Sequence, residues 1–386
     1  MRFPEFTEEW KKIKIGDITS KVGSGVTPKG GSAVYKTSGH LFIRSQNVGN
    51  GCFLLDDVAY IDEATHKKQI NTELKNGDVL LNITGASIGR TTVVNKNIEG
   101  GNVNQHVCII RLLEDYSPNY ICNYLLSYGG QKQIDSFQAG GNREGLNFEQ
   151  IRSIKFSIPS FIEQSKIASL LSLLEERIAT QNKIIEDLKK LKVAIIENVF
   201  KDKCCNHKIG DIITQVSIRN KSNNVPNVLS VSNKLGFVEQ SEQFEDRIVA
   251  SEDVRNYKIV QTNDFAYNPA RINVGSIARL KQQDTGIVSP MYICFHTKRL
   301  VLPEYLENFF YTQSFKHEIY KRLEGSVRLC LSYEGLTNIP IFIPGIPIQL
   351  EISKRLLALE RKIATEECYL NALEQQKQYL LQQMFI

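Results

Sequence analysis

The sequence predicts an α+β protein with two tandem, mixed and strand-rich domains, each followed by a long helix. The two helices are expected to pair as an antiparallel coiled coil with pseudo-two-fold symmetry. At 386 residues the chain is too long for one ordinary hydrophobic core. Its halves repeat each other in order, and each ends in a stretch with heptad spacing. We therefore expect domain 1–159, helix 160–203, domain 204–344 and helix 345–386.

The internal repeat is clearest late in each domain, where matches continue without a gap at an offset of 185 residues. Upstream the offset changes, as loops of different length would cause. The matched pairs are Arg143 and Arg328, Leu146 and Leu331, Phe148 and Tyr333, Ile158-Pro159 and Ile343-Pro344, Gln164 and Gln349, the segments 77–82 and 263–268, and the segments 14–18 and 208–212.

The domains themselves are predicted to be mixed, with short strands and one amphipathic helix each. Short apolar runs bounded by Gly and Asn clusters are typical of strands. Gly23-Ser24-Gly25 and the segment 85–89 lack the spacing of a dinucleotide-binding or phosphate-binding loop, so we expect turns there. The predicted strands are 41–44, 79–81, 91–94, 107–110, 228–231 and 291–295, and the predicted helices are 118–136 and 303–323.

The two tails follow a strict 3-4 spacing over four to five heptads, which indicates a coiled-coil seam. A capping box at Ser160 and Glu163 is expected to start the first helix, and Pro347 suits the first turn of the second. The alternative is that each helix packs on its own domain. The apolar seam positions are Ile167, Leu171, Leu174, Ile178, Ile185, Leu188, Ile195 and Val199, then Ile352, Leu356, Leu359, Ile363, Leu370, Leu373, Leu380 and Met384.

Composition narrows the class of protein. No apolar run is long enough to span a membrane, and the start of the sequence lacks a signal-peptide pattern, so we expect a cytoplasmic protein without a membrane partner. The eight cysteines show no zinc-ligand spacing, and we expect reduced thiols and no metal. A net charge of +5 leaves DNA binding open without proving it.

Catalytic motifs are missing from the sequence. No two prolines are adjacent, which excludes the Asn/Asp-Pro-Pro-aromatic motif of amino-methyltransferases, and no Pro-Asp pair anchors a nuclease signature. No nucleophile elbow or His-Glu-x-x-His zinc motif occurs. We therefore expect a chain that is not an enzyme by itself and binds no cofactor.

The pattern as a whole resembles the specificity subunit of type I restriction–modification systems, and the resemblance extends over essentially the full length. Each piece alone is weak, but their order, twice over, is specific. The second copy lacks a counterpart of residues 1–10. The residues that carry the resemblance are Trp10 with Gly16-Asp17-Ile18, the segments 43–48 and 77–81, Arg143 with Leu146, Ile158-Pro159 with Gln164, and the segment 264–275.

The resemblance implies a subunit with two target-recognition domains that reads a bipartite, asymmetric site in double-stranded DNA. It also implies two modification (methyltransferase) subunits and two restriction (translocase–nuclease) subunits as partners. S-adenosylmethionine, ATP and Mg²⁺ would belong to those partners. The DNA sequence of the site cannot be read from the chain, because base choice depends on a few loop side chains.

Candidate DNA-binding residues are basic or amide side chains in Gly/Asn-rich loops, since Arg suits guanine or phosphate and Asn or Gln suits adenine. Each of them could instead be a solvated or internally bonded polar residue. Arg44 and Asn268 lie on strand-like runs and are expected to brace the fold. The candidates are Lys29, Arg90, Asn102, Asn104, Gln105, Arg143, Arg271, Asn273, Arg279 and Arg328.

Two other classes remain open from the sequence. A stand-alone sequence-specific DNA-binding protein would share the duplicated domains but need no enzymatic partners. A coiled-coil adaptor would use the helices and show no sequence-specific DNA binding.

Overall fold

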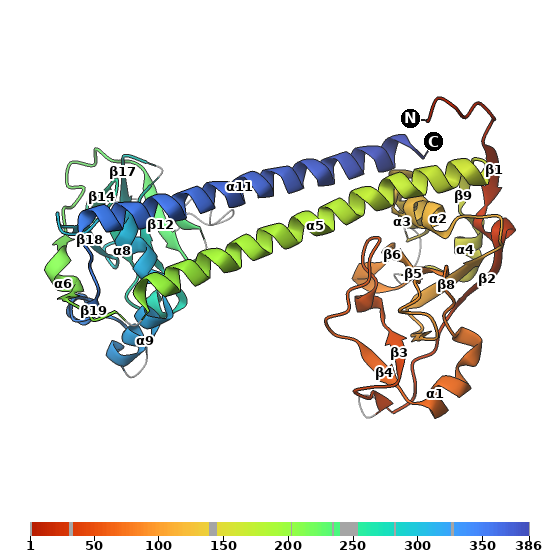
Figure 1. Ribbon diagram of the computed structural model, residues 1–386, viewed down its shortest axis with the longest axis horizontal. Helices are drawn as coiled ribbons and strands as arrows, with labels where there is room; N and C mark the ends of the chain where they lie inside the picture. The colour runs from red at the N-terminus through yellow and green to blue at the C-terminus, as the bar shows by residue number, and fades with distance from the viewer. Residues whose placement is uncertain are drawn as a thin grey trace. The chain divides into compact units, whose positions relative to one another are not determined.

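The computed structural model describes residues 2–30, 34–138, 145–201, 203–233, 235–239, 254–281, 283–325 and 328–385. The chain divides into two compact units (Figure 1). Unit 1 comprises Met1–Lys183 and Cys368–Ile386, and unit 2 comprises Ile184–Glu367. Each unit therefore contains one of the two predicted strand-rich domains and parts of both long helices, and the predicted α+β class is confirmed.

The main sheet of unit 1 is antiparallel, with strand order β2-β8-β5-β6. Both faces of its central strands are buried. Successive side chains of a strand point to opposite faces, so neighbouring residues enter different cores. Val79 and Ile110 enter the core against the helices, whereas Leu80 and Ile109 enter a second core. This explains the continuous apolar runs seen in the sequence. The strands are β2 (Thr19–Ser24), β5 (Val79–Asn82), β6 (Thr91–Val93) and β8 (Val107–Leu112).

The second core of unit 1 is covered by a three-stranded sheet of order β4-β3-β7, in which β3 and β7 run parallel. A separate antiparallel pair, β1-β9, ties the first strand of the chain to the residues just before the long helix. The elements are β1 (Lys11–Lys14), β3 (His40–Ile43), β4 (Ala59–Ile61), α1 (Glu63–Lys68), β7 (Asn102–Val103), α4 (Phe148–Ser153) and β9 (Lys155–Ile158).

Unit 2 repeats this topology, which confirms the internal duplication. Its antiparallel sheet has the order β11-β18-β15-β16, and its other sheet, β13-β12-β17-β14, again contains one parallel pair, β12-β17. Strand β14 has no strand counterpart in the described part of unit 1. The elements are β10 (His207–Lys208), α6 (Ile209–Ile212), β11 (Ile213–Val216), β12 (Val228–Ser232), β13 (Gly236–Glu239), β14 (Lys258–Gln261), β15 (Phe265–Tyr267), β16 (Ile277–Arg279), β17 (Thr285–Val288), β18 (Ile293–Thr297), α10 (Tyr333–Thr337) and β19 (Pro340–Ile341).

Matched residues of the repeat do the same structural work in both units. Gln164 accepts a hydrogen bond from the Ser117 backbone N–H at 3.0 Å, and Gln349 accepts one from the Leu302 N–H at 2.8 Å. Gly77 and Asn263 occupy the same turn with φ of 87° and 72°. Glycine and asparagine are the residues that adopt this left-handed conformation most readily, so the sequence match has a backbone cause.

The predicted amphipathic helices 118–136 and 303–323 are each two helices, which corrects that part of the sequence analysis. The break falls at a Ser or Thr that caps the next helix. Ser127 has extended backbone angles and accepts from the Gly130 N–H at 3.3 Å, and Thr312 accepts from the Phe315 N–H at 3.1 Å. Such side chains compete for backbone donors and favour a new helix start. The helices are α2 (Pro118–Leu126), α3 (Tyr128–Gln138), α8 (Pro303–Phe310) and α9 (Gln313–Arg322).

The two long helices are α5 (Phe161–Phe200) and α11 (Ile346–Gln383), which lie within the predicted ranges. Pro347 is in the first turn of α11, as predicted. The predicted capping box does not describe the start of α5. Both carboxylate oxygens of Glu163 instead accept from the Arg2 guanidinium at 2.8 Å, so this helix start is joined to the N-terminal segment.

Within each unit the two helices run side by side in opposite directions (Figure 1). In unit 1 Lys377 pairs with Glu175 at 2.9 Å, and in unit 2 Lys192 pairs with Glu360 at 2.6 Å. The second pair is the first one shifted by the repeat offset of 185 residues. All sixteen predicted seam residues are buried or half-buried. Lys192 and Lys377 occupy positions of the same 3-4 spacing that are not apolar, and both are ion-pair partners between the helices.

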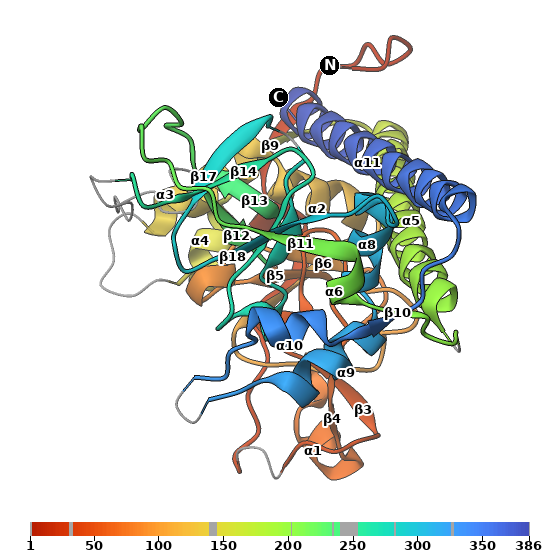
Figure 2. The ribbon, with the colours of Figure 1, turned by 90° about the vertical axis from the view of Figure 1, so that its left-hand side faces the viewer.

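The helix ends are exchanged between the repeats. Phe385, at the end of α11, packs against Tyr120 of α2 with ring centroids 5.2 Å apart, and both residues belong to unit 1. Phe200, at the end of α5, packs against Tyr305 of α8 at 5.0 Å, and both belong to unit 2. Figure 2 looks onto unit 2, where α8 lies between α5 and the sheet. Each core is thus completed by the helix that begins in the other repeat.

The alternative that each helix packs on its own domain describes only part of this arrangement. Ile167 and Leu171, near the start of α5, do enter the core of their own domain. Leu373 and Leu380, near the end of α11, enter that same core.

No helix of the described residues is long and apolar enough to cross a membrane.

Candidate nucleic-acid interface

Several loops gather at one end of the main sheet of unit 1. The strands are antiparallel, and Ser24 pairs with Cys108 while Asn82 pairs with Val107. The end of β2, the end of β5 and the start of β8 are therefore at the same place, which we call the loop end of the sheet. The described segments that project from it are 25–30, 83–90, 104–106 and 145–147.

Unit 2 has a loop end of the same construction. Leu331 donates its backbone N–H to the Pro269 carbonyl at 3.0 Å, just as Leu146 donates to the Ile83 carbonyl at 2.9 Å. In both units the segment before the last short helix is therefore fastened to the loop that follows the equivalent strand, β5 or β15. The described segments at this loop end are 217–227, 268–276, 289–292 and 328–332.

The loop end of unit 1 is closely packed where β2 leaves the sheet. A Cβ atom on Gly25 would lie 1.6 Å from the Val103 carbonyl oxygen of β7. Only glycine fits such an approach of two backbones. The segment after β2 is thereby brought against the turn that leads into β8, and the loops of this end are held by backbone packing.

Residues 7–190 match the family model of the type I restriction modification DNA specificity domain. The match covers the main sheet of unit 1, its loop end and most of α5. This segment, somewhat less than half of the chain, is therefore similar to that family.

A curated relative carries the same identification. The chain is 24% identical over 208 residues to the putative type I restriction enzyme MjaX specificity subunit of Methanocaldococcus jannaschii. The match covers 53% of this chain and 48% of that protein, so the chain spans about half the length of the curated relative it matches.

Solved structures resemble the chain over its whole length. The type I restriction–modification S subunit of M. genitalium has a TM-score of 0.59 and 13% identity, with 100% of this chain and 99% of that chain covered. The HsdS subunit of Thermoanaerobacter tengcongensis has a TM-score of 0.50 and 13% identity, with 99% and 97% covered. At these identities the similarity concerns the fold, which both halves of the chain share.

Three predicted DNA-binding residues lie exposed at the loop end of unit 1. Lys29 is in the turn after β2, Arg90 precedes β6, and Gln105 precedes β8. They come from three different loops, so the sheet topology rather than the sequence order brings them together. A fourth candidate, Arg143, lies outside the described residues.

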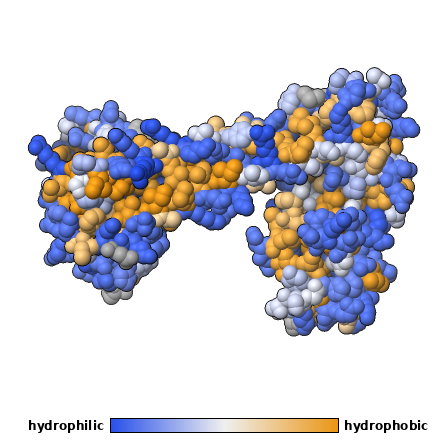
Figure 3. Space-filling model, viewed as in Figure 1, coloured by the Kyte–Doolittle hydropathy of each residue, from blue (hydrophilic) through white to orange (hydrophobic). Residues whose placement is uncertain are grey.

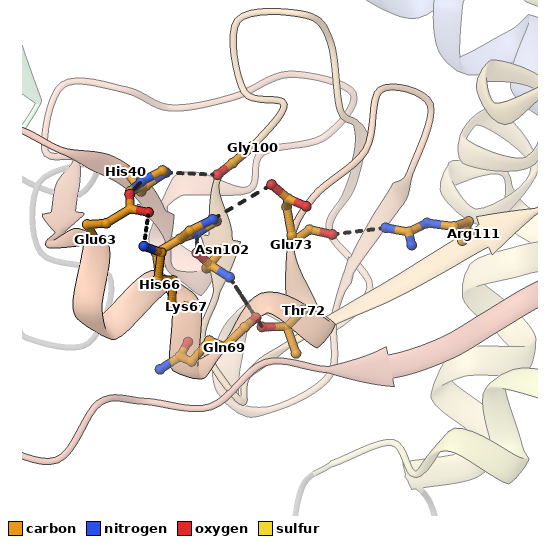
Figure 4. A network of polar contacts seen from close by, with 10 residues as sticks. All are labelled: His40, Glu63, His66, Lys67, Gln69, Thr72, Glu73, Gly100, Asn102 and Arg111. Carbon is orange, nitrogen blue, oxygen red and sulfur yellow. Dashed lines mark hydrogen bonds and ion pairs between the residues drawn. The ribbon is translucent and has the colours of Figure 1, made fainter.

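Asn102 is not accessible to a nucleic acid, and we remove it from the interface. Its side chain is fully buried, its Oδ1 lies 2.7 Å from His66 Nδ1, and its amide nitrogen donates to the Gln69 carbonyl at 3.0 Å (Figure 4). His66 in turn stacks on His40 with ring centroids 3.7 Å apart. The amide therefore fastens β7 to the α1 region, and its full burial keeps it away from DNA.

Asn104 likewise braces the turn before β8. It is buried, its backbone N–H donates to the Ile43 carbonyl at 3.1 Å, and its Oδ1 accepts from the His106 N–H at 3.1 Å. Arg44 and Asn268 also brace the fold, as the sequence predicted. Arg44 donates to the Asp57 carbonyl, and the buried Asn268 accepts from a neighbouring backbone N–H.

In unit 2 Arg279 is used internally. Its side chain is 9% exposed and pairs with Glu304 at 2.5 Å and with Glu307 at 3.0 Å. A guanidinium held by two carboxylates is not free for phosphate or guanine, so we remove Arg279 as well. Arg271 and Arg328 are exposed and Asn273 is half-buried, and all three lie on loops of the loop end.

Sequence reasoning missed the residues that hold Gln105. Thr27, Thr84 and His106 form hydrogen bonds with it or with each other across the loop end. A signal for His106 was present, since it directly precedes a predicted strand. No sequence signal identified Thr27, because its position depends on the close approach of the Gly25 backbone to Val103.

All eight cysteines are free thiols. Burial raises the pKa of the Cys108, Cys122 and Cys294 thiols to about 12, so these three remain protonated and unreactive at neutral pH. Among the residues that the structure describes, no group of three or more His, Cys, Asp or Glu side chains is placed to hold a metal ion.

Proposed function

We propose that the chain is the DNA sequence-recognition subunit of a type I restriction–modification complex. It reads a bipartite, asymmetric site in double-stranded DNA and positions methyltransferase and restriction subunits on it. The similarity of residues 7–190 to the type I restriction modification DNA specificity domain carries this proposal. The duplicated loop end supports extending it to the second half of the chain.

The asymmetry of the site follows from the two loop ends. The two loop ends have the same backbone arrangement but carry different side chains. The turn before the central strand carries Gln105 and His106 in unit 1, and Pro290 and Met291 in unit 2. Amide and imidazole groups suit polar base edges, whereas an exposed Met suits an apolar group such as the thymine methyl. Each unit then reads its own half of the site.

The partners follow from the same proposal. Two modification subunits and two restriction subunits assemble on this chain and hold S-adenosylmethionine, ATP and Mg²⁺. The chain itself acts without a catalytic site. An apolar patch on the face of unit 2 that carries the start of α11 is a candidate surface for them (Figure 3). The exposed apolar residues in the first part of α11 include Ile346, Ile348, Leu350 and Leu357.

The test is to map methylated adenines in the host genome with and without the gene for this chain. Loss of methylation at one bipartite motif, and its return on complementation, is the expected result. The purified chain should transfer no methyl group until its cognate modification subunit is added. Methyl transfer by the isolated chain, or an unchanged methylation pattern in the deletion strain, would contradict the proposal.

A further inference from the structure

Four side chains form a chain of hydrogen bonds across the loop end of unit 1. The Thr27 hydroxyl donates to Gln105 Oε1. Gln105 Nε2 donates to His106 Nε2 at 2.9 Å, and His106 Nδ1 lies 2.6 Å from the Thr84 hydroxyl oxygen. The chain joins three loops, those after β2, after β5 and before β8.

The donor and acceptor roles in these bonds determine which hydrogen-bonding groups of the Gln105 amide remain free. An amide nitrogen only donates, so His106 Nε2 is unprotonated and accepts, and its proton is on Nδ1, which donates to Thr84. Gln105 uses one of its two N–H groups and one of the two lone pairs on Oε1. One N–H donor and one oxygen lone pair therefore remain on the same exposed amide.

The backbone under Gln105 is held on both sides. The Val107 N–H donates to the Asn104 carbonyl at 3.3 Å, and the Ile83 N–H donates to the His106 carbonyl at 3.0 Å. With its backbone fixed and its amide oriented by two neighbours, Gln105 loses little further freedom on binding. Such preorganisation favours affinity and selectivity.

We propose that Gln105 reads an adenine in one half of the DNA site, with Thr27 and His106 as positioning residues. This inference rests on the proposed function. An adjacent donor and acceptor on one amide match adenine, which presents N7 as an acceptor and the N6 amino group as a donor in the major groove. Guanine presents two acceptors there, so it would leave the Gln105 oxygen without a partner.

The experiment uses the full chain in complex with its modification subunit and a library of randomised DNA sites. Parent complex should require adenine at one position of one half-site. Gln105→Ala should reduce that preference by about 5- to 150-fold, the value of one bidentate base contact, and leave all other positions unchanged. Gln105→Glu should shift the preferred base toward cytosine, because a carboxylate only accepts and the cytosine amino group only donates.

Positioning by His106 has its own readout. His106→Phe should weaken the preference at the same single position, while His106→Gln, which keeps an acceptor for the Gln105 amide, should restore part of it. A merely structural role would instead change affinity at all positions alike. Met291→Ala, at the matching turn of unit 2, is the reciprocal control, and any change it causes should be confined to the other half-site.

The outcomes separate this inference from the proposed function. If both Gln105 variants fold, assemble and keep the parent base preference at every position, Gln105 reads no base, although the chain remains a recognition subunit. If the parent complex shows no preferred site, the proposed function fails. Parent-like thermal unfolding of Gln105→Glu ensures that a lost preference is not lost folding.

Discussion

Asp78 and its counterpart Asp264 should respond differently to the same substitution. Both lie before the equivalent strand, β5 or β15, and each accepts from a backbone N–H three residues earlier at 2.8 Å. Only Asp78 has a guanidinium partner, Arg111, with two contacts of 2.7 Å. Replacing each Asp by Asn keeps the backbone contact and removes the charge.

The magnitude for Asp78→Asn follows from burial. The side chain of Asp78 is 1% exposed and that of Arg111 is 22% exposed. Removing one partner of a fully buried pair costs about 3–5 kcal/mol, and partial exposure of Arg111 lowers this to about 2–3 kcal/mol. For a unit of this size the unfolding midpoint should fall by about 4–12 °C.

Asp264→Asn should leave unit 2 as stable as before or slightly more so. Burial raises the pKa of the Asp264 carboxyl, which the Gln261 N–H and the charge of His296 only partly offset. The folded state therefore holds this proton more tightly than the unfolded state. The stability of unit 2 accordingly falls as the pH rises from about 3.9 through the folded-state pKa and stays lowered at neutral pH. Asparagine cannot ionise, so Asp264→Asn removes this loss of stability.

Thermal unfolding combined with hydrogen exchange tests this pair of substitutions. The amides of β5 and β8 should exchange faster in Asp78→Asn, and those of β15 and β18 should not exchange faster in Asp264→Asn. Equal destabilisation by both substitutions, or none by Asp78→Asn, would refute the reasoning from the Arg111 pair.

Three further outcomes are expected. Phe385→Ala should destabilise unit 1 and Phe200→Ala unit 2, each by about 3–5 kcal/mol, with hydrogen exchange showing that each effect stays in the unit where the ring is packed. Gly25→Ala should displace the segment after β2 because its Cβ would collide with Val103, and so lower both the unfolding midpoint and DNA binding of the complex. Arg328→Ala should weaken DNA binding of the complex by about 1–3 kcal/mol if it reads a base, and reduce the salt dependence if it contacts phosphate.

Local pattern was enough to predict the long helices, because a heptad seam is a property of consecutive residues. The same holds for the repeat, since Gly77 and Asn263 mark one turn in both copies. The division of each shorter helix was not predicted. Ser127 and Thr312 lie within stretches that otherwise have helical periodicity, and whether such a residue caps or continues a helix depends on its backbone angles.

The interface was predicted only in part, for a physical reason. A loop arginine or asparagine looks the same in sequence whether it faces solvent or a distant carboxylate. Arg279 finds Glu304 and Glu307 only after the chain has folded back on itself, and Asn102 finds His66 in the same way. Gln105 was identified, but Thr27, one of the two neighbours that orient it, comes from another loop.

The exchange of helix ends has a consequence for the order of synthesis. The N-terminal part of unit 1 leaves the ribosome before unit 2, yet Leu373, Leu380 and Phe385, which complete its core, are made after unit 2. At about 5–20 residues per second, the wait between residue 183 and residue 385 is about 10–40 s. During that time the Tyr120 face of the first domain lacks its partner, while the residues of unit 2 emerge as one uninterrupted stretch. The half that is translated first is therefore the half that finishes folding last.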